Sequence, residues 1–262
     1  MRLFTRKVHK SVAADNVVEV TELDGVRQLH LGTKTVQSGM SITDPYKLVF
    51  NYSRAIMYFL LFSDQIKTVL TIGLGGGSVT KYMHVHCEDI KQTVVEINSQ
   101  VIEVARSHFY LQANGDMLNV IEGDGIAYME EHPTSHDCVV IDGFDADGIP
   151  DGFCTQDFFD KCYGVLHDNG VFLINLWGSD KNFDIYLQRV EQTFSGRVLV
   201  LPTGKPGNII VYAFKDPVKI TEKKLRERVH ALNKVHKIDF TEFLDRLHEH
   251  NGYQKLYSIL ES

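Results

Sequence analysis

The stretch from Thr68 to Ser78, T-V-L-T-I-G-L-G-G-G-S, decides the fold. Its first half is an apolar run typical of a buried strand, and its glycines follow where that strand would end. Glycine lets the chain turn tightly into a helix and lets a ligand approach bare backbone. A dinucleotide-binding fingerprint needs G-x-G-x-x-G or a final alanine, whereas here the glycines are consecutive and Ser78 is last. The stretch predicts a strand–turn–helix unit, and a plain tight turn stays an alternative to a ligand site.

Strands and helices alternate after this first unit. The other predicted strands are Gln92–Ile97, Leu118–Glu122, Asp137–Asp142, Gly170–Leu176, Arg197–Leu201 and Asn208–Phe214. The predicted helices between them are Ser99–Phe109, Gly125–Glu131, Asp157–Val165 and Phe183–Phe194. The last two strands are joined by a loop too short for a crossover helix, so we expect them to be antiparallel. The pattern predicts an α/β, doubly wound, mostly parallel seven-stranded sheet of the S-adenosylmethionine-dependent methyltransferase type.

A small β region precedes this sheet. We expect strands at Val17–Leu23 and Val26–Leu31, joined by the turn Asp24-Gly25, and a third strand at Lys34–Gln37. The Asp44-Pro45 pair then predicts a helix start, and helical spacing of apolar residues extends that helix to Phe62. Two further helices are expected in the tail, at 221–233 and 240–250. We therefore expect an N-terminal unit of strands and a helix at 1–62, and a Rossmann-like catalytic domain with C-terminal helices at 63–262.

Composition excludes several classes of protein. The net charge is −7, whereas proteins that bind nucleic acid usually carry a basic excess. No apolar run reaches the roughly 18 residues of a membrane span. The four cysteines form no C-x-x-C pair, so we expect reduced thiols, no metal site and a cytoplasmic protein.

Three successive strand ends carry groups that suit a nucleoside. The glycines lie at the first, and Glu96 lies 23 residues after Gly73, where a carboxylate can accept both ribose hydroxyls. Asp124, between Gly123 and Gly125, can accept a hydrogen bond from an adenine amino group. Each acid alone could be an ordinary loop carboxylate. Because ligands bind outside the carboxyl ends of such strands, the three features together predict an adenosyl ligand.

The fourth strand ends in an acidic loop, V-V-I-D-G-F-D-A-D-G-I-P-D, which begins with Asp142 and Asp145. Carboxylates at that edge would attract a cation and could take a proton from an ammonium group. A solvated turn is the alternative, because Asp and Gly are common turn residues.

These motifs, in this order and spacing, resemble those of the polyamine aminopropyltransferases, the spermidine synthase family. The matching segments are I-G-L-G-G-G-S-V-T-K, V-V-E-I-N, I-E-G-D-G-I-A-Y-M and V-V-I-D-G-F-D-A-D-G-I-P. The resemblance runs from about Val36 to Trp177 and continues faintly to Phe214. It implies a transferase that takes decarboxylated S-adenosylmethionine as co-substrate, holds no tightly bound cofactor, and transfers an aminopropyl group to a diamine such as putrescine.

The resemblance also implies residue roles. Asp142 would be the general base and Asp145 would orient the diamine. Glu96 would bind the ribose, Asp124 the adenine, and Gln37 would lie near the aminopropyl group. The nucleoside would also contact five glycines: Gly73, Gly75, Gly76, Gly77 and Gly125. The acceptor pocket could be lined by aromatic residues, for which plain packing is the alternative: Tyr46, Tyr52, Phe144 and Trp177. The family resemblance further implies a homodimer formed through the N-terminal β region.

Several departures from the family pattern leave other functions open. Gly76 stands where the family has an acid, and the segment Thr43–Arg54 has lost most of the acidic and histidine residues that line the diamine pocket. A methyltransferase that uses S-adenosylmethionine is therefore an alternative, with Arg54 or Lys47 binding the donor carboxylate. A non-catalytic nucleoside-binding relative is the third possibility.

Overall fold

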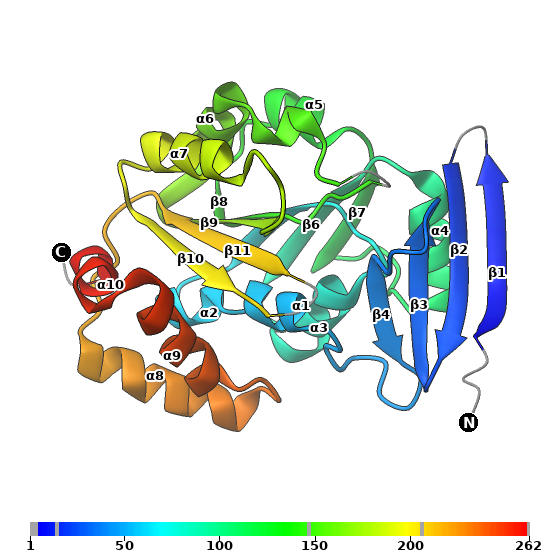
Figure 1. Ribbon diagram of the computed structural model, residues 1–262, viewed down its shortest axis with the longest axis horizontal. Coiled ribbons are helices and arrows are strands. Elements are labelled where there is room, and N and C mark those ends of the chain that lie inside the picture. The colour runs from blue at the N-terminus through cyan, green and yellow to red at the C-terminus, as the bar shows by residue number, and fades with distance from the viewer. Residues whose placement is uncertain (1–4, 14–15, 146–147, 205–206, 261–262) are drawn as a thin grey trace.

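Two β-sheets and ten α-helices make up the part of the chain that the computed structural model describes, namely residues 5–13, 16–145, 148–204 and 207–260. Figure 1 shows the small N-terminal sheet standing beside the central sheet, with helices on both faces of the latter. Ala146 and Asp147 of the acidic loop lie outside the described residues.

The central sheet has seven strands in the order β10-β11-β9-β8-β5-β6-β7. Neighbouring strands from β9 through β7 pair in parallel, whereas β11 is antiparallel to both β9 and β10. This confirms the mostly parallel sheet and its antiparallel last pair. The strands are β5 Thr68–Ile72, β6 Lys91–Glu96, β7 Leu118–Glu122, β8 His136–Ile141, β9 Leu166–Trp177, β10 Val198–Pro202 and β11 Asn208–Phe214.

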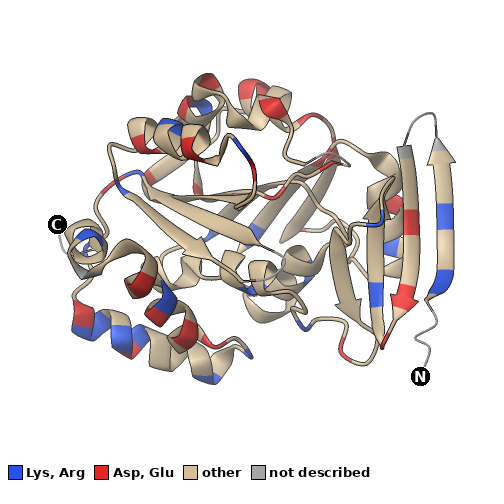
Figure 2. Cartoon of the chain, in the orientation of Figure 1, with Lys and Arg blue, Asp and Glu red and all other residues tan. Residues whose placement is uncertain are grey.

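Both faces of this sheet are buried. Val139 and Ile141 of β8 pack into the cluster beneath α5, α6 and α7, whereas Cys138 and Val140 face α1, α2, α3 and the C-terminal helices. Figure 2 shows many charged residues along the helices and the N-terminal sheet, and few along the central strands. The helices are α1 Asn51–Ile56, α2 Phe59–Phe62, α3 Ser78–His86, α4 Ser99–His108, α5 Gly125–Glu131, α6 Gln156–Gly164, α7 Phe183–Thr193, α8 Glu222–Val235, α9 Phe240–Asn251 and α10 Tyr253–Leu260, with a 3₁₀ turn at Asp151–Cys154.

The N-terminal sheet is antiparallel, in the order β1-β2-β3-β4, with β1 Arg6–Ala13, β2 Asn16–Leu23, β3 Val26–Leu31 and β4 Ser38–Ser41. Its apolar face, which includes Val18, Val20 and Leu29, packs with α4 residues in a third core cluster. The sequence does not predict β1, and the predicted third strand at Lys34–Gln37 is wrong. The pairing partner of β3 is 38–41, where Gly39 lies so close to the ring of Phe50 that a Cβ there would be 2.8 Å from it.

The predicted helix from Asp44 to Phe62 is also wrong in its first half. Leu48 instead forms a β-bridge with Met40, so the chain stays non-helical until Phe50. Beyond that point the helical spacing holds, but a tight turn separates α1 from α2, with the amide of Tyr58 donating to Ala55 over 2.8 Å. Tertiary pairing with β4 thus overrides the capping signal of Asp44-Pro45.

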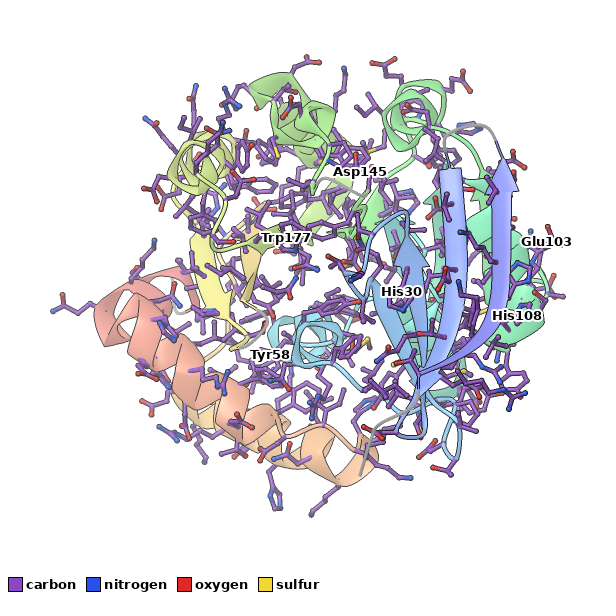
Figure 3. The ribbon with its side chains drawn as sticks, turned by 45° about the vertical axis from the view of Figure 1, so that its right-hand side comes forward. His30, Tyr58, Glu103, His108, Asp145 and Trp177 are labelled. Atoms are coloured by element: carbon purple, nitrogen blue, oxygen red, sulfur yellow. The ribbon has the colours of Figure 1, made fainter. Side chains whose placement is uncertain are left out.

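The C-terminal helices pack against α1 and α2. The ring of Tyr58 stacks on Phe240 at 5.3 Å, and its hydroxyl donates to the Phe240 carbonyl. Figure 3 labels Tyr58 between α1 and these helices. Among the described residues, none of the helices is both long enough and apolar enough to cross a membrane. The boundary between units at residues 62 and 63 stays a prediction.

Candidate active site

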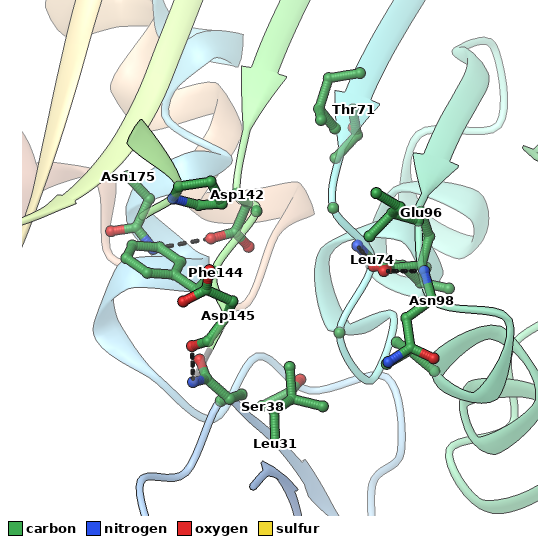
Figure 4. A pocket seen from close by; sticks show the side chains of 18 of the residues that line it. Leu31, Ser38, Thr71, Leu74, Glu96, Asn98, Asp142, Phe144, Asp145 and Asn175 are labelled. Atoms are coloured by element: carbon green, nitrogen blue, oxygen red, sulfur yellow. Dashed lines mark hydrogen bonds between the residues drawn. The ribbon is translucent and has the colours of Figure 1, made fainter. Parts of the chain in front are cut away.

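A cavity of about 1050 Å³ opens at the carboxyl ends of the parallel strands, between them and the N-terminal sheet. Eleven of the fourteen residues expected at the site line it: Gln37, Tyr52, Gly73, Gly75, Glu96, Asp124, Gly125, Asp142, Phe144, Asp145 and Trp177. Figure 4 shows Glu96 on one side of the cavity and Asp142 and Asn175 on the other. The fold thus gathers most of the expected site around one hollow.

The glycine-rich turn brings two strand ends into close approach. Gly73 has φ +96°, and a Cβ there would lie 2.4 Å from the backbone oxygen of Asp142. A side chain at this position would therefore push β5 and β8 apart, which explains the glycine. Gly77 has φ +67° and precedes the first turn of α3, so it too has a conformation that favours glycine.

Gly76 and Gly77, expected to contact the nucleoside, do not line the cavity. A Cβ on Gly76 would lie 2.9 Å from both the Phe109 ring and the Ser38 hydroxyl. The space that an acidic side chain would need at this position is thus filled by two neighbours. These two glycines shape the turn and its packing instead.

Glu96 is fixed by the backbone at the end of β6. Its Oε2 accepts from the Leu74 amide and its Oε1 from the Asn98 amide, each over 2.9 Å. Burial raises the pKa of this carboxyl, and the backbone hydrogen bonds oppose that rise. Because each carboxylate oxygen has two lone pairs, both oxygens can still accept from ribose hydroxyls.

Asp124 is the N-cap of α5. Its Oδ1 accepts from the amides of Ile126 and Ala127 over 2.7 and 3.1 Å. The side chain is exposed at the rim of the cavity. One carboxylate oxygen thus caps the helix, and the other takes no part in these capping hydrogen bonds.

Asp142 follows the last residue of β8. Its Oδ1 accepts from the Nδ2 amide of Asn175 over 2.8 Å. Burial raises the pKa of Asp142 to about 7, although the hydrogen bond from Asn175 lowers it. Near neutral pH this carboxyl group can therefore either hold or accept a proton.

Aromatic residues line the cavity together with Asp142. The rings of Phe144 and Trp177 stack at 5.5 Å and 21°. The hydroxyl of Tyr52, on α1, donates to the backbone oxygen of Gln37 over 2.9 Å. Figure 3 shows Asp145 between Trp177 and the N-terminal sheet, where His30 is labelled. This end of the cavity is consequently apolar apart from its acids and amides.

Tyr46 does not belong to this group. It lines a separate small cavity beside Tyr82 and His86, and its hydroxyl accepts from Gln112 over 3.5 Å. The loss of the expected helical turn at 44–50 carries Tyr46 away from the site.

No lysine, arginine or histidine lines the cavity within the described part of the chain. Arg54 donates to Asn51 and to the Val49 carbonyl, and Lys47 is exposed at another cavity. Among the described lining residues, four carry carboxyl groups, namely Glu96, Asp124, Asp142 and Asp145. The cavity is therefore acidic and suits cationic ligands.

Sequence reasoning missed Asn175 and Asn208. Both are buried, with 2% and 7% of their surface exposed, and both line the cavity. Asn175 interrupts the apolar strand V-F-L-I-N-L-W, and a lone amide in a buried strand is a signal that could have indicated it.

Comparison with solved structures supports the fold class. The chain resembles a spermidine synthase in complex with the transition state analogue AdoDATO, with a TM-score of 0.73 and 21% identity over 92% of this chain and 85% of that chain. It also resembles human methyltransferase-like protein 13 in complex with SAH, with a TM-score of 0.64 and 24% identity over 71% of this chain and 91% of that chain. The fold is thus the one shared by spermidine synthases and methyltransferases.

Sequence comparison defines the family. Residues 49–222 match the spermine/spermidine synthase domain model. The polyamine aminopropyltransferase of Chromobacterium violaceum is 40% identical over 96% of this chain and 97% of its own length. That of Neisseria meningitidis serogroup B is 39% identical over 89% and 90%. The chain therefore belongs to the spermine/spermidine synthase family, and these relatives are transferases.

Proposed function

We propose that this protein transfers an aminopropyl group from decarboxylated S-adenosylmethionine to an amine, with a diamine such as putrescine as the acceptor. The acceptor nitrogen forms a bond to the CH₂ carbon next to the donor sulfur, and the carbon–sulfur bond breaks. The sulfur keeps the electron pair and leaves as the neutral thioether of methylthioadenosine. The acceptor nitrogen loses its proton to Asp142, so charge and atoms balance.

The acidic lining of the cavity carries this proposal. Decarboxylated S-adenosylmethionine brings a sulfonium and an ammonium, and an amine acceptor brings a further positive charge. The carboxyl groups at the two ends of the cavity are suited to such partners. A donor that retains its carboxylate would find no cationic side chain among the described lining residues, which disfavours the methyltransferase alternative.

In this proposal, two pairs of acidic residues have separate roles. Glu96 and Asp124 bind the ribose and the adenine, while Asp142 and Asp145 receive the amine. An amine attacks only when neutral, yet a free alkylamine is mostly protonated at pH 7. The pKa of about 7 at Asp142 suits it to take that proton before the neutral nitrogen attacks the donor carbon. Holding donor and acceptor in line removes much of the entropic barrier.

One assay tests the proposal against its alternatives. The purified protein is incubated with putrescine and either decarboxylated or ordinary S-adenosylmethionine, and the nucleoside products are separated. Methylthioadenosine formed only with the decarboxylated donor is the expected result. S-adenosylhomocysteine formed from the ordinary donor would indicate a methyltransferase, and binding without turnover would indicate a non-catalytic relative. Asp142→Asn should reduce turnover at least about 10²-fold while donor binding persists.

We further propose a cytoplasmic homodimer that uses the N-terminal sheet. Strand β1 is an edge strand whose Val12 side chain is 61% exposed, and unpaired edges can join a second chain. Light scattering on the purified protein and on a Val12→Lys variant tests this. A monomeric mass for the unaltered protein would contradict it.

A further inference from the structure

A short chain of side-chain amides leads from Asp142 into the sheet. Asn175 on β9 donates through Nδ2 to Asp142 over 2.8 Å, and its Oδ1 accepts from Nδ2 of Asn208 over 3.0 Å. Asn208 is the first residue of β11, the antiparallel neighbour of β9. Of these two amides, only that of Asn175 donates to Asp142, so an effect of Asn208 along these hydrogen bonds must pass through Asn175.

While Asp142 is ionised, the chemistry of the groups fixes the direction of these hydrogen bonds. An ionised carboxylate only accepts, whereas an asparagine side chain has one donating end and one accepting end. While Asn208 donates to the oxygen of Asn175, the NH₂ group of Asn175 faces Asp142. If Asn175 turned over, its oxygen would face the carboxyl group and favour the protonated form, which cannot accept a proton.

The backbone of Asn208 is held firmly. The amide and the hydroxyl of Thr203 both donate to its carbonyl oxygen over 2.9 Å. Asn51 on α1 in turn donates to the Thr203 carbonyl over 3.0 Å. Because Asn208 is also buried, its side chain has little room to move away from Asn175.

We propose that Asn208 is a positioning residue, which sets the orientation of the Asn175 amide and thereby keeps Asp142 in the form that accepts the proton of the acceptor amine. This inference rests on the proposed function, in which Asp142 is that acceptor. The hydrogen bond from Asn208 goes to Asn175 and not to Asp142, so the proposed effect on the carboxyl group passes through Asn175, although Asn208 also lines the cavity.

Other titratable groups also face this carboxyl group. Tyr52 approaches from α1, and burial together with the charge of Asp142 raises the pKa of its hydroxyl, so Tyr52 stays neutral. Asp145 is on the same loop, and Glu96 and Asp124 line the far side of the cavity. A variant that adds charge would mix their effects, so the test uses neutral replacements.

The test measures the pKa of Asp142 directly in the ligand-free protein. Aspartate labelled with ¹³C at Cγ is titrated by NMR, and the Asp142 signal is assigned by its loss in Asp142→Asn. Four proteins are compared: unaltered, Asn208→Leu, Asn175→Leu and the double variant. The pH profile of kcat/KM is measured on the same four.

We expect Asn208→Leu to raise the pKa of Asp142 by about one unit in the unaltered background. In the Asn175→Leu background the same change should have no effect, because the relay is already broken. The acidic limb of the kcat/KM profile should move with the NMR pKa. If Asn208→Leu does not fold, Asn208→Ser replaces it, since serine is too short to reach Asn175.

Two results would overturn the inference: an unchanged pKa in Asn208→Leu, or an equal shift in both backgrounds. The NMR titration needs no turnover, so it separates this inference from the proposed function. The expected shift without any aminopropyl transfer would reject only the proposed function. Transfer with an unmoved pKa would reject only the role of Asn208.

Discussion

The side-chain amide of Gln37 donates to the backbone carbonyl oxygen of Asp145 over 3.1 Å, joining two segments that lie 108 residues apart. The Tyr52 hydroxyl reinforces this link by donating to the backbone oxygen of Gln37. The segment before β4 is thereby tied to the acidic loop at the cavity. Part of the site is thus built from the N-terminal region, outside the central sheet.

Removing this link should loosen the acceptor side of the cavity. Gln37→Ala is expected to lower kcat/KM for the amine about fivefold to tenfold, because one hydrogen bond contributes about 1 kcal/mol. Steady-state kinetics with putrescine measures the effect. Lys34→Ala, an exposed change in the same loop, is the control and should leave kcat/KM unaltered. Equal values for Gln37→Ala and the unaltered enzyme would speak against a role for the link.

The raised pKa of Asp142 has a consequence for stability. Burial moves it from 3.8 to about 7, so between these pH values the folded protein holds a proton that the unfolded chain has lost. The free energy of unfolding should therefore fall as pH rises from 4 to 7. Asp142→Asn removes this dependence and should be more stable than the unaltered protein by about 4 kcal/mol at pH 8, with no gain at pH 4.

Urea unfolding at pH 4 and pH 8 measures that difference. Asp168→Asn, a change of an exposed carboxylate, is the matched control and should show no comparable gain at pH 8. A gain of equal size at both pH values would mean that the Asp142 carboxyl group is not the cause.

Asp124 caps α5, and in the proposed function it also binds the adenine; one substitution can separate the two roles. Asn is about as good an N-cap as Asp, so Asp124→Asn should change the stability by less than about 0.5 kcal/mol. Affinity for methylthioadenosine, measured by calorimetry, should fall about tenfold or more because the carboxylate is lost. Asp239 caps α9 in the same way, accepting from Thr241 and Glu242, and Asp239→Asn should leave the affinity unchanged. Similar affinities for all three proteins would remove Asp124 from the nucleoside site.

Trp177 is the only tryptophan in the chain, and its ring stacks on Phe144 within the cavity. Its fluorescence should change on addition of methylthioadenosine and putrescine, because ligands displace water beside the indole. Phe144→Leu should diminish that change and raise the KM for the amine about threefold to tenfold. Tyr46→Leu, which alters an aromatic residue outside the cavity, should do neither. A fluorescence change that persists fully in Phe144→Leu would mean that the stacked pair does not contribute to acceptor binding.

Restoring the acidic residue that the family has at position 76 should harm this protein. A Cβ on Gly76 would meet the Phe109 ring and the Ser38 hydroxyl at 2.9 Å, so Gly76→Asp should cost about 1–3 kcal/mol of stability. Thermal unfolding measures the loss. Gly115→Asp is the control, since a Cβ at Gly115 meets nothing within 4 Å. Unchanged stability together with higher activity in Gly76→Asp would show that the neighbours can make room.

The central sheet could be predicted because its signals are local. A run such as that before Asp142 is apolar throughout, and the turn at Gly73 needs a residue without a side chain. The N-terminal region is harder to predict from the sequence. Strand β4 has little β-propensity, and it exists because β3 pairs with it and Phe50 packs on Gly39.

The candidate site shows the same division. Glu96 and Asp124 follow strand ends, so the parallel topology alone brings them to one edge. The family resemblance implied that Tyr46 could line the acceptor pocket, but it lines another cavity, and the helix expected at its position does not form. Asn208 could not be linked to Asp142 from the sequence, because their connection runs through Asn175 on a third strand.

The order of strands, glycines and acids along the chain by itself determined the doubly wound sheet and the edge at which a nucleoside would bind. Only the tertiary structure decided which side chains share the cavity, that Gly76 has no room for an acid, and which amide contacts Asp142. Lys81 illustrates the difference: a lysine in a sequence predicts an exposed charge, yet it is fully buried and donates to the carbonyls of Pro45 and Phe109. Local propensity and periodicity act over a few residues, whereas burial, hydrogen-bond partners and pKa values depend on segments that meet only after folding.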